Sequence, residues 1–101
     1  MKVSELCSMI EESIKSGRYP LETETQKKCA GLLKVTSKSA ADDLKSDDAA
    51  VEVRVGDLYF TTNFSPNMQH LPGVIEADVL DSFRLICRKV DRIDTGVKIG
   101  R

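Results

Sequence analysis

Apolar residues recur every three or four positions near both ends of the chain, and each of these stripes predicts a helix. The first stripe stops before Gly17, a residue type that commonly follows the last turn of a helix. The second follows Asp78, whose side chain can cap a helix, and a strand over residues 83–90 is the alternative. The stripes consist of Val3, Leu6, Ile10 and Ile14 in the first, and Val79, Phe83, Ile86, Cys87, Val90 and Ile93 in the second.

In the middle of the chain the helical spacing gives way to alternation. Residues 51–55 alternate Val with charged residues, and strand-forming residues resume at 58–62 after a Gly-Asp pair. Two such runs joined by two turn-forming residues predict a β-hairpin. Residues 63–74 are rich in Pro and Asn and are expected to form an irregular loop, which leaves 75–101 for the C-terminal helix and tail.

The segment 25–45 carries two short apolar stripes separated by a residue that can begin a helix. Thr36 can cap a second helix over residues 37–45, because its hydroxyl can accept from the free N–H groups of the first turn. We therefore predict two helices joined by a tight turn, a helix-turn-helix. A single amphipathic helix over the same segment has a similar period and is the alternative. The stripe residues are Ala30 and Leu33 before the turn, and Ala40 and Leu44 after it.

The composition fits one domain over residues 1–101, because a chain of this length with 41% apolar and 31% charged residues can bury a core without disulfides or a structural metal. Its three cysteines, Cys7, Cys29 and Cys87, are far apart and lack Cys-x-x-Cys spacing, so we expect buried thiols in a reducing compartment. No segment resembles a signal peptide or a membrane span. We therefore expect a cytoplasmic protein without membrane contact.

The formal net charge is −1, but the charges are unevenly spread along the chain. Residues 24–40 carry a net charge of +3, residues 41–52 carry −4, and residues 84–101 carry +4. This balance excludes a protein that coats nucleic acid with a generally basic surface. Any surface that binds anions must therefore be local.

The predicted order of helix, extended link, helix-turn-helix and hairpin is that of a winged helix. Over residues 3–62 the chain resembles the DNA-binding domain of GntR-type bacterial regulators. The resemblance implies an α+β, winged-helix-like fold with two to three N-terminal helices, a β-hairpin and a C-terminal helix, and a small DNA-binding transcriptional regulator of bacterial or phage type. It is carried by Ile14-Lys15-Ser16-Gly17-Arg18-Tyr19-Pro20, Ala30-Gly31-Leu32-Leu33-Lys34-Val35-Thr36 and Gly56-Asp57-Leu58-Tyr59-Phe60.

In such a regulator the start of the second helix would face the base edges of double-stranded DNA in the major groove. Basic residues around it would neutralise phosphates and set its orientation. The chain departs from the family at Lys34, where a glycine is usual, and at Asp42 and Asp43, where a basic residue is often found. The predicted DNA-binding residues are Ser37, Lys38 and Ser39 for bases, and Lys27, Lys28, Lys34 and Arg54 for phosphates.

The acidic stretch supports a second hypothesis, a non-enzymatic protein-interaction module that acts as an inhibitor or adaptor on the same scaffold. Its residues 42–52 or its basic C-terminal helix would meet a charged partner, and that helix could also join two copies in a homodimer. No enzyme is expected, because His70 is the only histidine and has no Cys near it in the sequence. No residue spacing indicates a metal site, and no cofactor motif is present.

Overall fold

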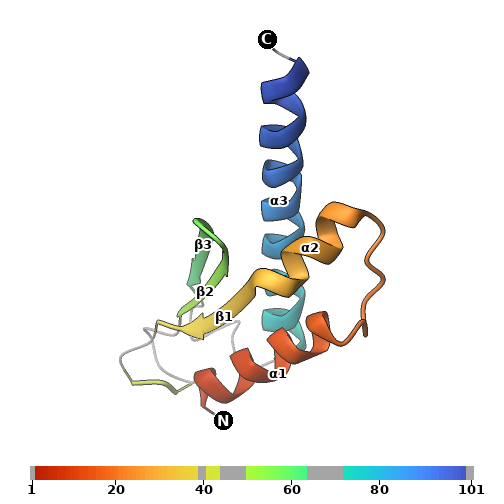
Figure 1. Cartoon of the computed structure of the whole chain (residues 1–101). Coiled ribbons are helices and arrows are strands. Elements are labelled where there is room, and N and C mark those ends of the chain that lie inside the picture. The colour runs from red at the N-terminus through yellow and green to blue at the C-terminus, as the bar shows by residue number, and fades with distance from the viewer. Residues whose placement is uncertain (1, 39–40, 44–49, 64–71, 100–101) are drawn as a thin grey trace.

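The computed structural model describes residues 2–38, 41–43, 50–63 and 72–99 (Figure 1). These residues form an α+β fold with two N-terminal helices, a three-stranded antiparallel sheet and a long C-terminal helix. Within this part of the chain, no helix has the length and apolarity that a membrane crossing requires. The elements are α1 (Val3–Lys15), α2 (Glu24–Leu32), β1 (Leu33–Ser37), β2 (Ala50–Val55), β3 (Leu58–Asn63) and α3 (Pro72–Ile99).

The three strands pair in the order β1-β2-β3, each antiparallel to its neighbour. β2 and β3 form the predicted hairpin, in which Val55 pairs with Leu58 across a two-residue turn. Gly56 begins this turn with a φ of +60°, a value that glycine adopts without the steric cost of a Cβ. β1 pairs with the other side of β2, where Leu33 lies opposite Val55. The hairpin prediction is therefore confirmed.

The core lies between one face of the sheet and the apolar stripes of the helices. α1 lies beside β1, while α3 packs against β2 and β3, so the two long helices cover different parts of the sheet. Figure 1 shows α1 running across the foot of α3. The prediction of the first helix is confirmed, since all four residues of its stripe are buried. The sheet contributes Leu33, Val35, Val51, Val53 and Val55 to the core, and α3 contributes Ile75, Val79, Phe83, Ile86 and Cys87.

The C-terminal helix is confirmed, but it begins at Pro72, before the predicted cap at Asp78. Proline suits the first turn of a helix, because the N–H that it lacks has no partner within the helix there. The alternative of a strand over residues 83–90 is wrong, since α3 continues to Ile99. Most of the predicted loop, residues 64–71, lies outside the described residues. Figure 1 shows the last turns of α3 extending beyond the sheet.

The predicted helix-turn-helix is wrong where the structure describes it. α2 ends at Leu32 and leads directly into β1, so the alternative of one helix over residues 25–45 is wrong as well. Ser37, the expected start of the second helix, ends a strand, and residues 41–43 lie outside the helices and named strands. Residues 39–40 and 44–45 of the predicted helix lie outside the described residues.

The reason for this difference is the pairing of β1 with β2. Leu33 and Val35 alternate with polar residues, so one face of a strand can bury both of them. Val55 and Val53 lie opposite them on β2 and supply both the backbone partners and the apolar contacts. This pairing joins residues about 20 positions apart, and it outweighs the local helical spacing that Leu33 shares with α2.

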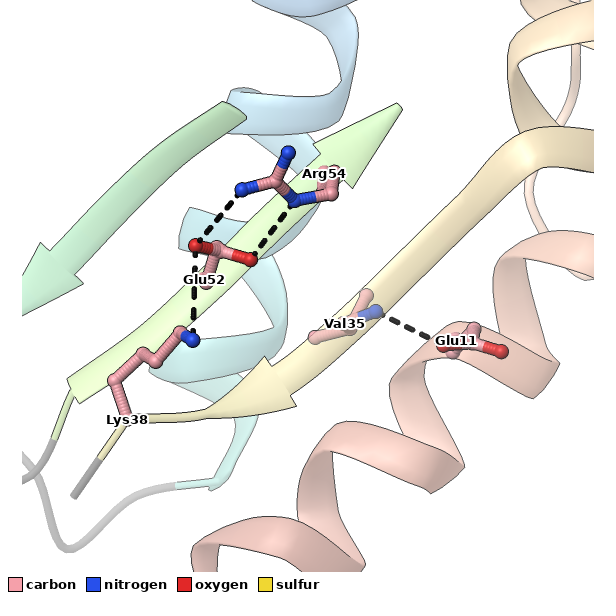
Figure 2. Close-up of polar contacts among 5 residues, drawn as sticks. All are labelled: Glu11, Val35, Lys38, Glu52 and Arg54. Carbon is pink, nitrogen blue, oxygen red and sulfur yellow. Dashed lines mark hydrogen bonds and ion pairs between the residues drawn. The ribbon is translucent and has the colours of Figure 1, made fainter. Parts of the chain in front are cut away.

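The outer edge of β1 is closed by a side chain of α1 (Figure 2). The backbone N–H of Lys38 donates to the Ala50 carbonyl at 2.9 Å. Because N–H groups alternate in direction along a strand, the N–H of Val35 points away from β2. It donates to Oε1 of Glu11 at 2.9 Å, and Lys15 Nζ lies 3.6 Å from Oε2 of the same carboxylate. Glu11 therefore accepts from an edge N–H that could otherwise pair with a strand of another molecule.

We expect Glu11→Ala to lower the free energy of unfolding by about 1–3 kcal/mol, because it leaves the partly buried N–H of Val35 without its acceptor. Urea denaturation followed by circular dichroism measures this loss. Glu12→Ala is the control, since it makes the same change at an exposed position on the same helix. Equal losses for the two variants would show that the edge contact contributes nothing.

Candidate functional site

The second face of the sheet carries polar residues from all three strands. Strand residues alternate between faces, so the register that buries the valines turns their neighbours outward. Lys34, Arg54 and Tyr59 form one row across the three strands, because Lys34 pairs with Arg54 and Arg54 pairs with Tyr59. Thr36, Glu52 and Thr61 form the next row. We call these six residues, together with Lys38, the open sheet face.

Glu52 is the centre of the polar contacts on the open sheet face (Figure 2). Arg54 Nε donates to its Oε2 at 3.1 Å, and Arg54 Nη2 lies 3.5 Å from its Oε1. Lys38 Nζ lies 3.9 Å from the same Oε1. The Glu52 side chain is 12% exposed, whereas those of Arg54 and Lys38 are 40% and 52% exposed. One inner carboxylate therefore accepts hydrogen bonds from Arg54 and lies within ion-pair distance of Lys38.

These contacts also favour the charged form of Arg54. The pKa of its guanidinium is raised, chiefly because it donates to the Glu52 carboxylate. Burial acts in the opposite direction, and the negative charges of Glu52 and Asp57 act in the same direction as the hydrogen bond. Like any arginine, Arg54 is a permanent cation, which suits a ligand with negative charge.

Tyr59 places an aromatic ring beside these cations. The Cζ atom of Arg54 lies 4.7 Å from the centroid of the Tyr59 ring, within the range of a cation–π contact. The residue is 56% exposed, although tyrosine is a large and partly apolar side chain. The guanidinium and the ring thus form a pair of flat groups at one end of the open sheet face.

The structure brings together three of the seven predicted DNA-binding residues. Lys34, Lys38 and Arg54 share the open sheet face, where they outnumber its single carboxylate. Lys27 and Lys28 instead belong to α2, where Lys27 Nζ lies 3.3 Å from Glu24 Oε1.

The predicted base-reading residues are distributed differently. Ser37 lies opposite Val51 on the core side of the sheet and is only partly exposed, so it does not belong to the open sheet face. Ser39 lies outside the described residues. Of the three, only Lys38 contributes to the cluster around Glu52.

Asp42, an acidic residue expected on the second helix, has another role. Asp42 Oδ1 accepts from the Ser4 backbone N–H at 2.8 Å, and Oδ2 accepts from the Ser4 hydroxyl at 2.6 Å. These bonds lower the pKa of Asp42. The Asp42 carbonyl also accepts from the Val3 N–H at 3.3 Å. Asp42 therefore supplies acceptors to the free N–H groups at the start of α1, where negative charge is favourable.

Four members of the open sheet face were not among the predicted DNA-binding residues: Thr36, Glu52, Tyr59 and Thr61. For the three on β2 and β3, the signal was the predicted hairpin itself. Counting outward from the Gly56-Asp57 turn places Tyr59 opposite Arg54, on the side away from the valines. The proximity of Glu52 to Lys38 had no such local signal, because it depends on the pairing of β1 with β2.

The cysteines are confirmed as buried free thiols. Burial is the largest of the effects that raise the pKa of Cys7 and of Cys87 to about 12. A thiol of that pKa is a poor nucleophile at neutral pH, because the thiolate is the reactive form. Among the described residues, no group of three or more His, Cys, Asp or Glu side chains could hold a metal ion.

We expect Cys7 and Cys87 to resist labelling in the folded protein. At pH 8 a thiol of pKa about 12 is ionised in roughly one molecule in ten thousand, far less than an exposed cysteine. Labelling with Ellman's reagent should therefore be slow in buffer and rapid in concentrated guanidinium chloride. Rapid reaction of two or more of the three thiols in the folded protein would contradict this expectation.

Comparisons of the chain with protein-family models, with curated proteins and with solved structures give no match. A functional proposal for this protein therefore rests on the chemistry of its own residues. Among the described residues, the open sheet face combines three cations, an aromatic ring and hydroxyl groups. Surfaces of this kind can bind phosphates and aromatic bases.

Proposed function

We propose that this protein binds nucleic acid through the open sheet face and catalyses no reaction there. The observation that carries the proposal is the convergence of Lys34, Lys38 and Arg54 on one exposed surface. They come from β1, from the residue after it and from β2, and they lie on the face opposite the core. Lys34 and Lys38 are separated by about 13 Å of extended chain. Cations spread over that distance suit the successive phosphates of a nucleic-acid backbone better than a single small anion.

The proposal moves the nucleic-acid contact from a helix to the sheet. A winged-helix regulator would insert the helix over residues 37–45 into the major groove. Since the described part of that segment contains the end of β1 and an irregular stretch, Lys38 contributes through its position beside Glu52 instead. In this proposal the hairpin still contributes a phosphate contact, because Arg54 is on the exposed side of β2.

Three phosphate contacts imply a measurable salt dependence. Each neutralised phosphate releases condensed counterions, and three contacts correspond to a loss of affinity of about 20- to 40-fold between about 50 and 200 mM salt. A larger loss would require cations outside the open sheet face. The salt dependence therefore counts the residues that take part.

The test is fluorescence anisotropy with labelled mixed-sequence DNA, both single-stranded and duplex, at these two salt concentrations. We expect Lys34→Ala/Lys38→Ala to weaken binding and to reduce the salt-dependent loss to about threefold, since one of three contacts remains. The control is Lys27→Ala/Lys28→Ala, which removes the same charge from α2. It should leave both the affinity and the salt dependence nearly unchanged.

Two outcomes would overturn the proposal. The first is no binding at tens of micromolar by a folded sample, which would favour the protein-interaction module instead. The second is an equal loss for the two double variants, which would show that general charge, not the open sheet face, attracts the nucleic acid.

We expect Glu52→Gln to tighten binding severalfold, which is the opposite direction from the lysine variants. The change removes the one negative charge of the open sheet face and keeps an amide oxygen that can still accept from Arg54. The same anisotropy titration measures it. Weaker binding would mean that ordering the cations matters more than the charge that Glu52 removes.

A further inference from the structure

We propose that the nucleic acid bound by the open sheet face is single-stranded, and that one of its bases stacks on the Tyr59 and Arg54 pair. This inference rests on the proposed function and adds the form of nucleic acid that the site selects. Its starting point is the placement of an exposed ring next to a guanidinium, 4.7 Å from Cζ to ring centroid.

The exposure of Tyr59 is the first argument. The residue is 56% exposed at the second position of β3, whereas Phe60 on the other face packs against the core, with its ring centroid 5.4 Å from Lys89 Nζ. Flat aromatic rings and guanidinium planes are the groups on which proteins stack unpaired bases. Any base has a face that suits them, so such contacts need no particular sequence.

The dimensions of the sheet are the second argument. Its outer strands lie about 10 Å apart, and side chains add to that width. The major groove of duplex DNA, about 12 Å wide, accepts a helix or a two-stranded ribbon. A three-stranded face would therefore meet mainly the backbone of a duplex, whose base faces are already covered by neighbouring bases. A single strand presents bases to Tyr59 and phosphates to the lysines together.

The placement of the cations is the third argument. Lys34 on β1 and Lys38 directly after it are four residues apart, about 13 Å of extended chain, while Tyr59 is two strands away on β3. A strand whose backbone follows β1 could direct a base across β2 onto the Arg54 and Tyr59 pair. In the neighbouring row of the face, Thr36 and Thr61 flank Glu52, and their hydroxyls could bond to base edges.

Tyrosine emission offers a direct test, because the chain has no Trp and only two Tyr. In Tyr19→Phe the emission comes from Tyr59 alone, and a stacked base should quench it. The ligands are oligothymidylate and oligouridylate of about 20 nucleotides, a duplex of equal length, and an abasic strand with the same phosphates but no bases. We expect quenching and the tightest binding with the two single strands that carry bases.

Three variants test the role of the ring: Tyr59→Ala, Tyr59→Phe and Thr61→Ala. Their affinities for the same ligands are measured by fluorescence anisotropy. We expect Tyr59→Ala to weaken binding of the base-carrying strands about tenfold and to leave the abasic strand unaffected. Tyr59→Phe should keep most of the affinity, because it keeps the ring. Thr61→Ala controls for a change on the same face of β3 that removes no aromatic group.

The outcomes separate this inference from the proposed function. Binding of the abasic strand as tight as that of oligothymidylate, without quenching, would overturn base stacking and leave phosphate binding in place. A duplex that binds more tightly than either single strand would overturn the single-strand preference. Failure of all four ligands to bind a folded protein would overturn both proposals.

Discussion

The pairing of β1 with β2 is the constraint on which the rest of the structure depends. It buries Leu33 and Val35 against the valines of β2 and so forms the sheet side of the core. Because strand side chains alternate, the same register sends Lys34 to the opposite face, into line with Arg54. A shift by one residue would place cations in the core and valines in solvent. The open sheet face is thus fixed by the hydrophobic core behind it.

The sequence was sufficient for those parts of the fold that are decided locally. The stripe of α1, the alternation of β2 and the Gly56-Asp57 turn each identify their element, since all the residues needed are neighbours in the chain. The segment after Leu32 is different, because its residues fit a helical period and a strand period at once. Its strand partner lies beyond residues 38–49, and only that distant pairing decides between the two structures.

The same division applies to the candidate site. Lys34, Lys38 and Arg54 were identified from the sequence by their charge, but they were assigned to a turn, a helix and a wing. The structure unites them on a sheet. Positive charge in a chain of nearly neutral composition was an informative signal, although it did not give the geometry. The contact between Lys38 and Glu52, 3.9 Å, required knowledge of which strands lie side by side.

The contacts between α1 and the segment around β1 are reciprocal. Asp42, beyond the end of β1, bonds to the first turn of α1, and Glu11, in the third turn of α1, bonds to the edge of β1. If α1 separates from the segment around β1, the backbone N–H groups of Ser4 and Val35 both lose their acceptors. These two contacts tie the local stability of α1 to that of residues 33–38 and 41–43.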